Sequence, residues 1–255
     1  MDQPKNLLTE ECSQQRYEAE RLQGEKIISG IEGDAWGWSG AAGTIRAERR
    51  ADFLIQAAGL KPGVRCLEVG CGTGEFTERL LRANCDLYAV ELSEITAKRC
   101  QERVGNRARV IVGNLETGEG LSDYTFDAIV GVSVLHHLNL PLFFKATLSR
   151  LKPGGRFAFS EPNMANPQIW AERNIGFVRK WRHVTPHETA FRTRSLRKMF
   201  EAEGLVVDVC EPFEFLHPAT PKFAVPLLKG IERMVEATPL RAIAGSIRFA
   251  GHKPA

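Results

Sequence analysis

From residue 64 onward, short apolar runs alternate with amphipathic stretches of helical period. The apolar runs predict strands, and the segments in which apolar residues recur every three or four positions predict helices. Ser93 stands where a helix N-cap is expected, and Gly105 stands where that helix should stop. The predicted strands cover 64–69, 87–92, 108–114, 126–135 and 156–163, and the helices between them cover 73–84, 93–105 and 141–155.

The predicted strands are apolar along their whole length rather than at alternate positions. A strand needs no alternation when both of its faces are buried, which is the condition in a parallel sheet covered by helices. A helix at 47–60 precedes the first strand, and two more strands, 205–216 and 245–252, follow Gly204 with a helix between them. The pattern therefore predicts an α/β fold with a doubly wound, Rossmann-like sheet.

The turn after the first strand holds glycines at alternate positions, in "LEVGCGTGEF". Glycine tolerates positive φ and lets the backbone approach a ligand closely, and this turn usually lines the ligand crevice of such a sheet. Two common phosphate loops do not fit, because no lysine follows Gly74 and position 75 is Glu where the dinucleotide fingerprint needs Gly. The Glu75 carboxylate would also repel a pyrophosphate at the helix start. The loop predicts a ligand without phosphates.

Glu91 ends the second predicted strand, in "LYAVELS". A carboxylate at this position of a doubly wound sheet can accept hydrogen bonds from both hydroxyls of a ribose. Together with the glycine turn, Glu91 predicts a ligand that contains a ribose and lacks a phosphate.

Five segments, in this order and spacing, resemble the class I S-adenosylmethionine-dependent methyltransferases: "LEVGCGTGEF", "AVELSE", "VGNLE", "FDAIVGVSVLHHL" and "LKPGGRFAFSEPN". The resemblance runs from about residue 45 to residue 210. It implies a seven-stranded, mostly parallel sheet with a C-terminal antiparallel strand pair. It also implies S-adenosyl-L-methionine as the cofactor and S-adenosyl-L-homocysteine as the product.

Carried onto this sequence, the resemblance implies a row of cofactor-binding positions along the strand ends. Glu68, Gly70 and Ser133 would lie near the methionine moiety, and Glu91 would hold the ribose. The family often has Asp where this chain has Asn114 beside the adenine, and an amide oxygen can still accept a hydrogen bond there. Each position has an alternative interpretation as a tight turn or strand end without a ligand. The expected set is Glu68, Gly70, Cys71, Gly72, Gly74, Glu91, Leu92, Asn114, Leu115 and Ser133.

Methyl transfer from a sulfonium mainly requires alignment and exclusion of water, and a hydroxyl acceptor also benefits from a general base. We expect His137 or His136, after the fourth predicted strand, to be that base, with His183 and His187 as later candidates. The family commonly carries histidine in this loop without using it as a base, so fixing the loop is the alternative role. Pro186 interrupts any helix that would pair the last two histidines, and we expect no metal.

Three segments are additions to the predicted core. We expect an N-terminal helical and loop cap at 1–44 and a methyltransferase domain at 45–255, with cap insertions at about 163–192 and 216–244. Large aromatic rings can close over a cofactor or stack on a substrate, and they can equally anchor a cap to the core. The residues expected to contact the acceptor are Trp36, Trp38, Trp170, Arg179, Trp181 and His183.

The two insertions also differ in chemistry. Between Trp170 and Phe200, eight Lys or Arg stand against two Glu. This segment predicts an acceptor with a carboxylate or phosphate, and a solvated face is the alternative. The later insertion carries an apolar stripe at helical spacing, for which core packing is the simplest interpretation. A lid over a lipid-like acceptor, a dimer face and a membrane contact are the alternatives. The stripe consists of Leu227, Leu228, Ile231, Met234 and Val235.

Composition narrows the setting further. The chain has 255 residues and a formal net charge of +3, so its overall charge does not favour nucleic acid as a partner. Its six cysteines form no C-x-x-C pair, which favours free thiols. We find neither a signal-peptide core nor the roughly 18 consecutive apolar residues of a membrane span. We expect a cytoplasmic protein, with no oligomer indicated.

We therefore expect S-adenosylmethionine-dependent methyl transfer to a small or medium organic acceptor, anionic or linked to a lipid or sugar. The accepting atom, oxygen, nitrogen or carbon, is left open. A nicotinamide-dependent oxidoreductase is one alternative, which Glu75 and the C-terminal strand pair disfavour. A module that binds the cofactor without catalysis is another, because this chemistry needs no obligatory side chain.

Overall fold

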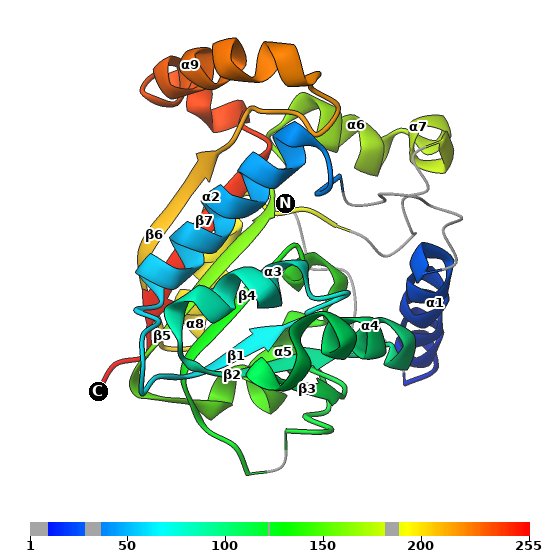
Figure 1. Cartoon of the computed structure of the whole chain (residues 1–255), viewed down its shortest axis with the longest axis vertical. Coiled ribbons are helices and arrows are strands. Elements are labelled where there is room, and N and C mark those ends of the chain that lie inside the picture. The colour runs from blue at the N-terminus through cyan, green and yellow to red at the C-terminus, as the bar shows by residue number, and fades with distance from the viewer. Residues whose placement is uncertain (1–9, 29–36, 122, 182–188) are drawn as a thin grey trace.

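The computed structural model describes residues 10–28, 37–121, 123–181 and 189–255. Within them the chain forms a seven-stranded sheet of order β3-β2-β1-β4-β5-β7-β6 (Figure 1). The first five strands pair in parallel, and β7 runs antiparallel to both of its neighbours. The predicted doubly wound sheet with a C-terminal antiparallel pair is confirmed. Its strands are β1 (Arg65–Val69), β2 (Asp86–Glu91), β3 (Arg109–Val112), β4 (Phe126–Val132), β5 (Leu151–Pro162), β6 (Val206–Phe213) and β7 (Ser246–His252).

Helices cover both faces of the sheet, as the continuous apolar strands require. One face packs against α2 (Ala41–Ala57), α3 (Glu75–Leu80) and α4 (Glu94–Val104), through small strand residues such as Ala128 and Ala158. The other face carries a phenylalanine core under α5 (Leu140–Ala146) and α8 (Thr193–Ala202), where the Phe200 and Phe249 rings lie 4.6 Å apart. Burial of these aromatic rings makes a large hydrophobic contribution to folding.

Several predicted boundaries differ from the structure, and two of the differences have a clear physical cause. The fourth strand ends at Val132 rather than three residues later, because Ser133 has a φ of 52° and turns the chain. The helix predicted at 141–155 ends at Ala146, a short 3-10 turn follows, and β5 already begins at Leu151. Leu151 pairs with Phe126 of β4. Sheet pairing therefore extends the fifth strand back into a segment whose local pattern predicts a helix.

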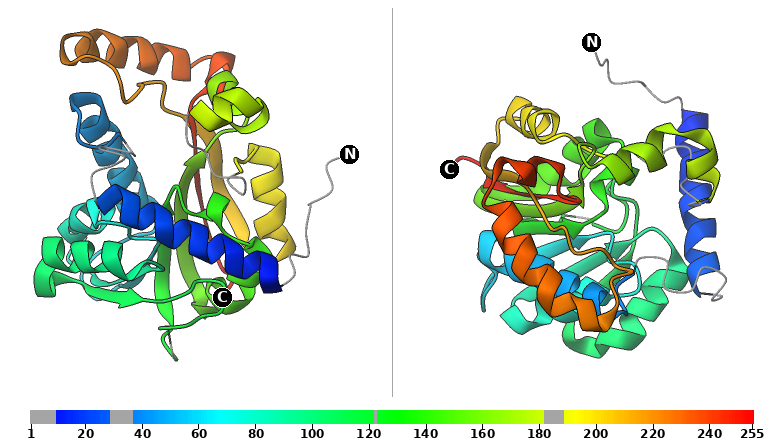
Figure 2. Two further views of the ribbon diagram at one scale, coloured as in Figure 1. Left: turned by 90° about the vertical axis from the view of Figure 1, so that its right-hand side faces the viewer. Right: turned by 90° about the horizontal axis from the view of Figure 1, so that it is seen from above.

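The remaining helices belong to the segments expected as additions. They are α1 (Glu10–Ile28), α6 (Pro167–Asn174), α7 (Gly176–Trp181) and α9 (Val225–Glu236). The left view of Figure 2 shows α1 crossing in front of the strands, with α6 and α9 above it. The expected domain boundary at 44–45 stays a prediction, although α2 runs continuously across it. Within the described ranges, every helix is too short or too polar to cross a bilayer.

Candidate active site

A cavity of about 480 Å³ lies at the carboxyl ends of the central strands. The strand order reverses between β1 and β4, and a doubly wound sheet binds its ligands in the crevice beside such a reversal. The volume lies within the range of about 300–1,000 Å³ that is typical of small-molecule sites. The loops after β1, β2, β3 and β4 line the cavity together with residues of α1, α2 and α6.

The glycine turn after β1 forms part of the cavity wall. Gly70 and Gly72 have φ values of 68° and 53°, and both line the cavity with Cys71. A Cβ atom on Gly70 would lie 2.5 Å from Cγ2 of Val134, so a side chain there would push apart the turns that follow β1 and β4. Gly74 lies behind the cavity wall, where its missing side chain leaves room for Cys100 of α4.

Glu91 lies at the end of β2 with its carboxylate in the cavity wall. Its Oε2 accepts a hydrogen bond from the backbone N–H of Gly72 at 2.9 Å, and its Oε1 accepts one from Ser93 at 3.0 Å. Burial raises the pKa of Glu91, although these backbone N–H groups oppose the shift. Each carboxylate oxygen has two lone pairs, so both can still accept a hydrogen bond from a ligand.

Asn114 and Leu115, after β3, are buried and line the same cavity, as does Leu92. Oδ1 of Asn114 accepts a hydrogen bond from the backbone N–H of Glu116 at 2.9 Å, which holds the turn. The Leu115 carbonyl accepts one from the Thr147 hydroxyl at 2.6 Å. The two residues thus present a rigid wall, part polar and part apolar.

Glu68 lies in β1 beneath the glycine turn and does not line the cavity. Burial raises the pKa of Glu68 to about 8. Its Oε2 atom is buried without a hydrogen-bond partner among the described residues. The carboxyl group is therefore mostly protonated at neutral pH, since a buried charge without a partner is costly.

His136 lines the cavity and forms a buried pair with Glu161, which lies behind the cavity wall. Nδ1 of His136 lies 2.8 Å from Oε2 of Glu161, and Oε1 of Glu161 accepts the backbone N–H groups of Val134 and Leu135. Sequence reasoning missed Glu161, although it stands at the end of the fifth predicted strand, where a carboxylate in "FSEPN" is a signal for the ligand crevice.

A second group missed from the sequence is the pair Arg46 and Arg50, which lie one turn apart on α2 and both line the cavity. They share the carboxylate of Glu214, with N···O distances of 2.9 Å and 2.5 Å. Burial would raise the pKa of Glu214, but the two guanidinium groups outweigh it and hold that pKa below its usual value. Both cations also lie 5.0 Å from the ring centroid of Trp38. The signal was the i, i+4 arginine spacing in "TIRAERR".

Arg50 also contacts the residue that follows β4. Its Nη1 donates a hydrogen bond to the Ser133 hydroxyl at 3.4 Å. Ser133 lines the cavity with a φ of 52°. A non-glycine residue in this conformation is strained, and such strain clusters at functional sites. Nη1 of Arg46 is buried with no hydrogen-bond partner in the described part of the chain.

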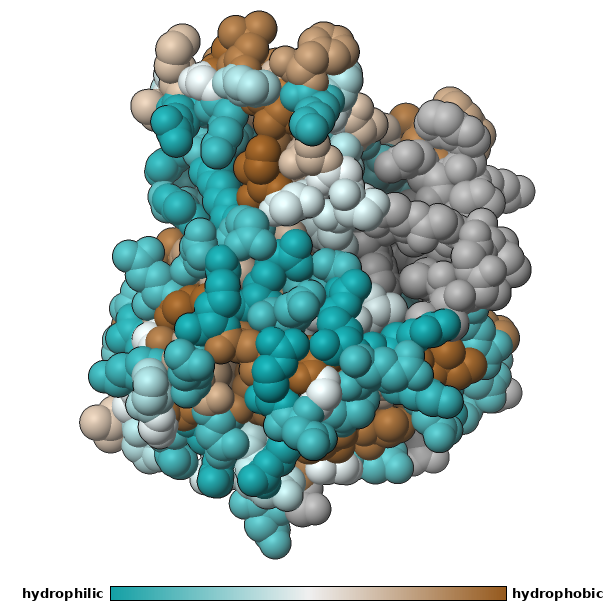
Figure 3. Space-filling view, viewed as in Figure 1, coloured by the Kyte–Doolittle hydropathy of each residue, from teal (hydrophilic) through white to brown (hydrophobic). Residues whose placement is uncertain are grey.

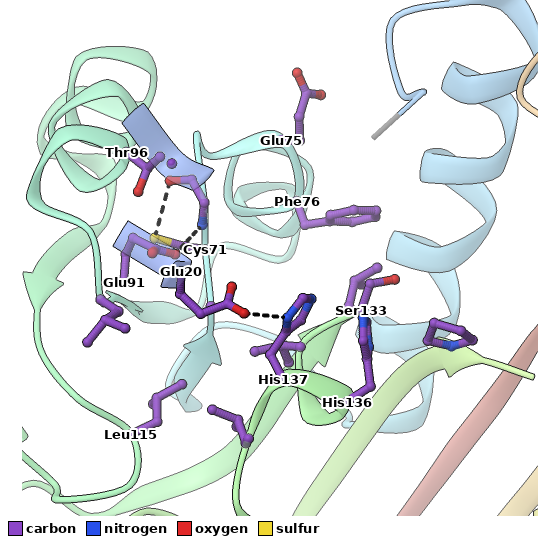
Figure 4. A pocket seen from close by; sticks show the side chains of 18 of the residues that line it. Glu20, Cys71, Glu75, Phe76, Glu91, Thr96, Leu115, Ser133, His136 and His137 are labelled. Atoms are coloured by element: carbon purple, nitrogen blue, oxygen red, sulfur yellow. Dashed lines mark hydrogen bonds and ion pairs between the residues drawn. The ribbon is translucent and has the colours of Figure 1, made fainter. Parts of the chain in front are cut away.

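Helix α1 covers one side of the cavity and contacts the turns that follow β3 and β4. Oε1 of Glu20 lies 3.0 Å from Nδ1 of His137, and Figure 4 shows the Glu20 carboxylate pointing toward this ring. Arg16 donates to the His137 carbonyl at 3.1 Å and forms an ion pair with Glu116, which also accepts from the Tyr17 hydroxyl. His137 therefore joins α1 to the loop after β4, whereas His136 is held from the sheet side.

The residues expected to contact the acceptor fall into three groups. Trp38 lines the cavity, whereas Trp170 and Arg179 do not. Trp36 and His183 lie outside the described residues, and so does the side chain of Trp181. Of the basic segment, Arg173 is the residue that reaches the lining among those described.

Comparison with known proteins adds independent findings. A family model described as "Methyltransferase domain" matches residues 43–208. A ubiquinone biosynthesis O-methyltransferase of Idiomarina loihiensis is 29% identical over 153 residues, which cover 56% of this chain and 62% of that protein. Nodulation protein S of Rhizobium tropici is 28% identical over 61% of this chain and 62% of its own length. The match thus spans about three fifths of the length of these relatives.

A solved structure described as the [4+2]-cyclase SpnF superposes with a TM-score of 0.66 at 18% identity. The match covers 94% of this chain and 96% of that one. This likeness supports the fold, and it leaves the reaction to be argued from the site itself.

Proposed function

Because this chain belongs to the methyltransferase-domain family, of the class I S-adenosylmethionine-dependent type, we propose that it transfers a methyl group from S-adenosylmethionine to a hydroxyl oxygen of a small organic acceptor. The observation that carries the choice of oxygen is the pairing of His136 with Glu161, because His136 lines the same cavity as the glycine turn and Glu91. Family membership disfavours a nicotinamide-dependent oxidoreductase.

The residues of the cavity match three parts of S-adenosylmethionine: the ribose, the adenine and the methionine carboxylate. Glu91 keeps acceptor capacity for the ribose hydroxyls, and Leu92 and Leu115 offer apolar surface beside Asn114 for the adenine. Arg46 would hold the methionine carboxylate, because its buried Nη1 has no partner among the described residues and two guanidinium groups share the single carboxylate of Glu214. The cofactor would then lie between the Glu91 end and the Ser133 end of the cavity, which Figure 4 shows at opposite sides.

The hydrogen bond to Glu161 determines which nitrogen of His136 can act as the general base. Its Nδ1–H donates to Glu161, so the neutral imidazole carries its lone pair on Nε2. His136 accepts the hydroxyl proton at Nε2, and Glu161 stabilises the resulting imidazolium. S-adenosylmethionine, when bound, supplies an electrophilic methyl group on its sulfonium sulfur. Helix α1 excludes water from the cavity, which favours transfer to the acceptor over hydrolysis.

For the acceptor we propose an anionic group that contacts Arg173 of α6, which lines the cavity. We further propose that the protein works in the reducing cytoplasm. The five described cysteines, Cys66, Cys71, Cys85, Cys100 and Cys210, are free thiols, in line with that compartment.

The test separates binding from turnover. Isothermal titration with S-adenosylhomocysteine, S-adenosylmethionine and NADH should show binding of the first two only. Single-turnover reactions with a panel of phenols, alcohols and amines, each with and without a carboxylate, should then yield S-adenosylhomocysteine with a hydroxyl-bearing acid. Binding without turnover on the whole panel would favour the non-catalytic module, and turnover confined to amines would contradict the proposed oxygen acceptor.

A further inference from the structure

Helix α9 packs onto the protein through its polar side. Glu232 and Glu236 point inward, where their carboxylates lie 3.1 Å and 2.5 Å from the guanidinium nitrogens of Arg49 on α2. The same two carboxylates accept backbone N–H groups of residues 214–216. Val225 is the residue of this helix that joins an apolar cluster. A helix on the surface of a globular protein normally buries its apolar stripe and exposes its charges.

The apolar stripe of this segment consequently faces solvent, so core packing, its simplest interpretation from the sequence, is wrong. Phe223, Leu227 and Met234 are 86%, 69% and 68% exposed, and Ile231 extends the same side of the helix. Leu240 and Ile243, in the short turn Pro239–Ile243 that follows, are exposed as well. Figure 3 shows hydrophobic residues at the top of the molecule, where Figure 1 places α9. Such a group of large side chains marks an interaction surface.

The charges beside this apolar side have one sign. Lys222, Lys229 and Arg233 are exposed and make no ion pair with any residue that the structure describes. Arg241 pairs with Glu211 of β6. Because both acidic residues of the segment 216–245 point inward, its outer surface combines apolar side chains with unneutralised cations.

The segment also stands beside the cavity. Pro218 precedes α9 and Gly245 follows its 3-10 turn, and both residues line the cavity. A surface that binds through α9 would therefore face the approach to the proposed acceptor site.

We propose that the α9 surface, formed by Phe223, Leu227, Ile231 and Met234 with Lys222, Lys229 and Arg233, docks the protein on an anionic lipid bilayer. Amphipathic helices with this combination lie in the interface, with the apolar side chains among the acyl chains and the cations at the anionic head groups. A second copy of the chain fits less well, because a symmetric contact places the same patch on both partners and brings like charges together. The docking does not depend on the methyl transfer proposed above.

The test is flotation of the full chain with vesicles of phosphatidylcholine alone or mixed with phosphatidylglycerol. The protein should float with the anionic vesicles, and salt should weaken the binding because it screens the charges. Leu227→Glu with Met234→Glu, and separately Lys229→Glu with Arg233→Glu, should each weaken binding at least about tenfold. S-adenosylhomocysteine affinity, measured on the same samples, should stay unchanged and shows that the variants are folded.

Matched controls carry the same substitutions at exposed positions elsewhere: Val112→Glu with Leu142→Glu, and Lys61→Glu with Lys98→Glu. These variants should bind the anionic vesicles as the unaltered chain does. The proposal is overturned if the unaltered chain stays with the lipid-free fraction, or if the controls lose as much binding as the α9 variants. It is also overturned if light scattering shows a dimer that Leu227→Glu with Met234→Glu dissociates, because a second copy then covers this surface.

Discussion

The Nδ1 atom of His136 lies 2.8 Å from Oε2 of Glu161, a carboxylate with no solvent exposure. The two residues come from the turn after β4 and from the end of β5, so the central pairing of the sheet brings them together. The other oxygen of Glu161 holds the backbone of the same turn. One buried carboxylate therefore sets both the position of the loop and the tautomer of the histidine.

The first prediction concerns this pair. His136→Ala should lower single-turnover methyl transfer to a hydroxyl acceptor by about 100- to 10,000-fold, because the proton then has no base. Glu161→Gln keeps the amide oxygen for the backbone N–H groups but cannot accept from Nδ1 through its NH2 group, so it should also lower turnover. Both variants should bind S-adenosylhomocysteine normally in isothermal titration.

His137 provides the matched control for His136. It contacts Glu20 of α1 rather than the sheet, so His137→Asn should change turnover by less than about tenfold. If His136→Ala retains full turnover while His137→Asn loses it, the roles proposed for the two histidines are reversed.

The second prediction concerns Arg46. Arg46→Gln should weaken S-adenosylhomocysteine binding by about tenfold, since one charge-assisted hydrogen bond to the methionine carboxylate is lost. Binding of 5′-methylthioadenosine, which lacks that carboxylate, should stay the same. Titration of both ligands into both proteins provides the comparison. Equal weakening of the two ligands would show that Arg46 supports the fold rather than the carboxylate.

The third prediction concerns Glu68 and pH. Its pKa in the folded protein is about 8, against an ordinary value of 4.5. The folded state therefore holds a proton that the unfolded chain releases, and this contribution to stability is complete below pH 4.5 and is lost as pH rises toward 8. From this group alone, the free energy of unfolding should fall by roughly 1 kcal/mol per pH unit across that window.

The isosteric variant Glu68→Gln removes this titration while keeping the shape of the side chain. Urea unfolding of both proteins at about pH 5 and about pH 8 should show the variant gaining stability relative to the unaltered chain as pH rises. Parallel pH profiles for the two proteins would mean that Glu68 is already ionised in the folded state.

The fourth prediction concerns the charge of the acceptor. Arg173→Gln should raise the KM for an anionic acceptor by about tenfold, by removing a cationic contact, and leave cofactor affinity unchanged. Arg179→Gln is the control, because Arg179 belongs to the same segment and does not line the cavity. An unchanged KM in Arg173→Gln would contradict the proposed contact between Arg173 and an anionic group of the acceptor.

Much of the fold could be predicted because the signals are local. Apolar runs such as 64–69 indicate buried strands whatever their neighbours, and the Ser93 cap and Gly105 stop bound α4 as predicted. The same holds for Gly70, Gly72 and Glu91, whose positions at strand ends already place them in the crevice of a doubly wound sheet. The strand order that this fold class implies is enough to bring these residues together.

The features that the sequence did not predict depend on contacts between segments that lie far apart along the chain. Glu161 lies 25 residues from His136, and Arg46 lies 168 residues from Glu214, so no local pattern pairs them. Sheet pairing also overrode the helical pattern at Leu151. Helix α9 is the plainest case. Its sequence predicts an apolar stripe and a charged side, but the period of the pattern does not determine which of the two sides faces the protein interior. Arg49 on α2 binds Glu232 and Glu236 and so turns the apolar side to solvent, because ion pairs between segments far apart in sequence form only once the chain has folded.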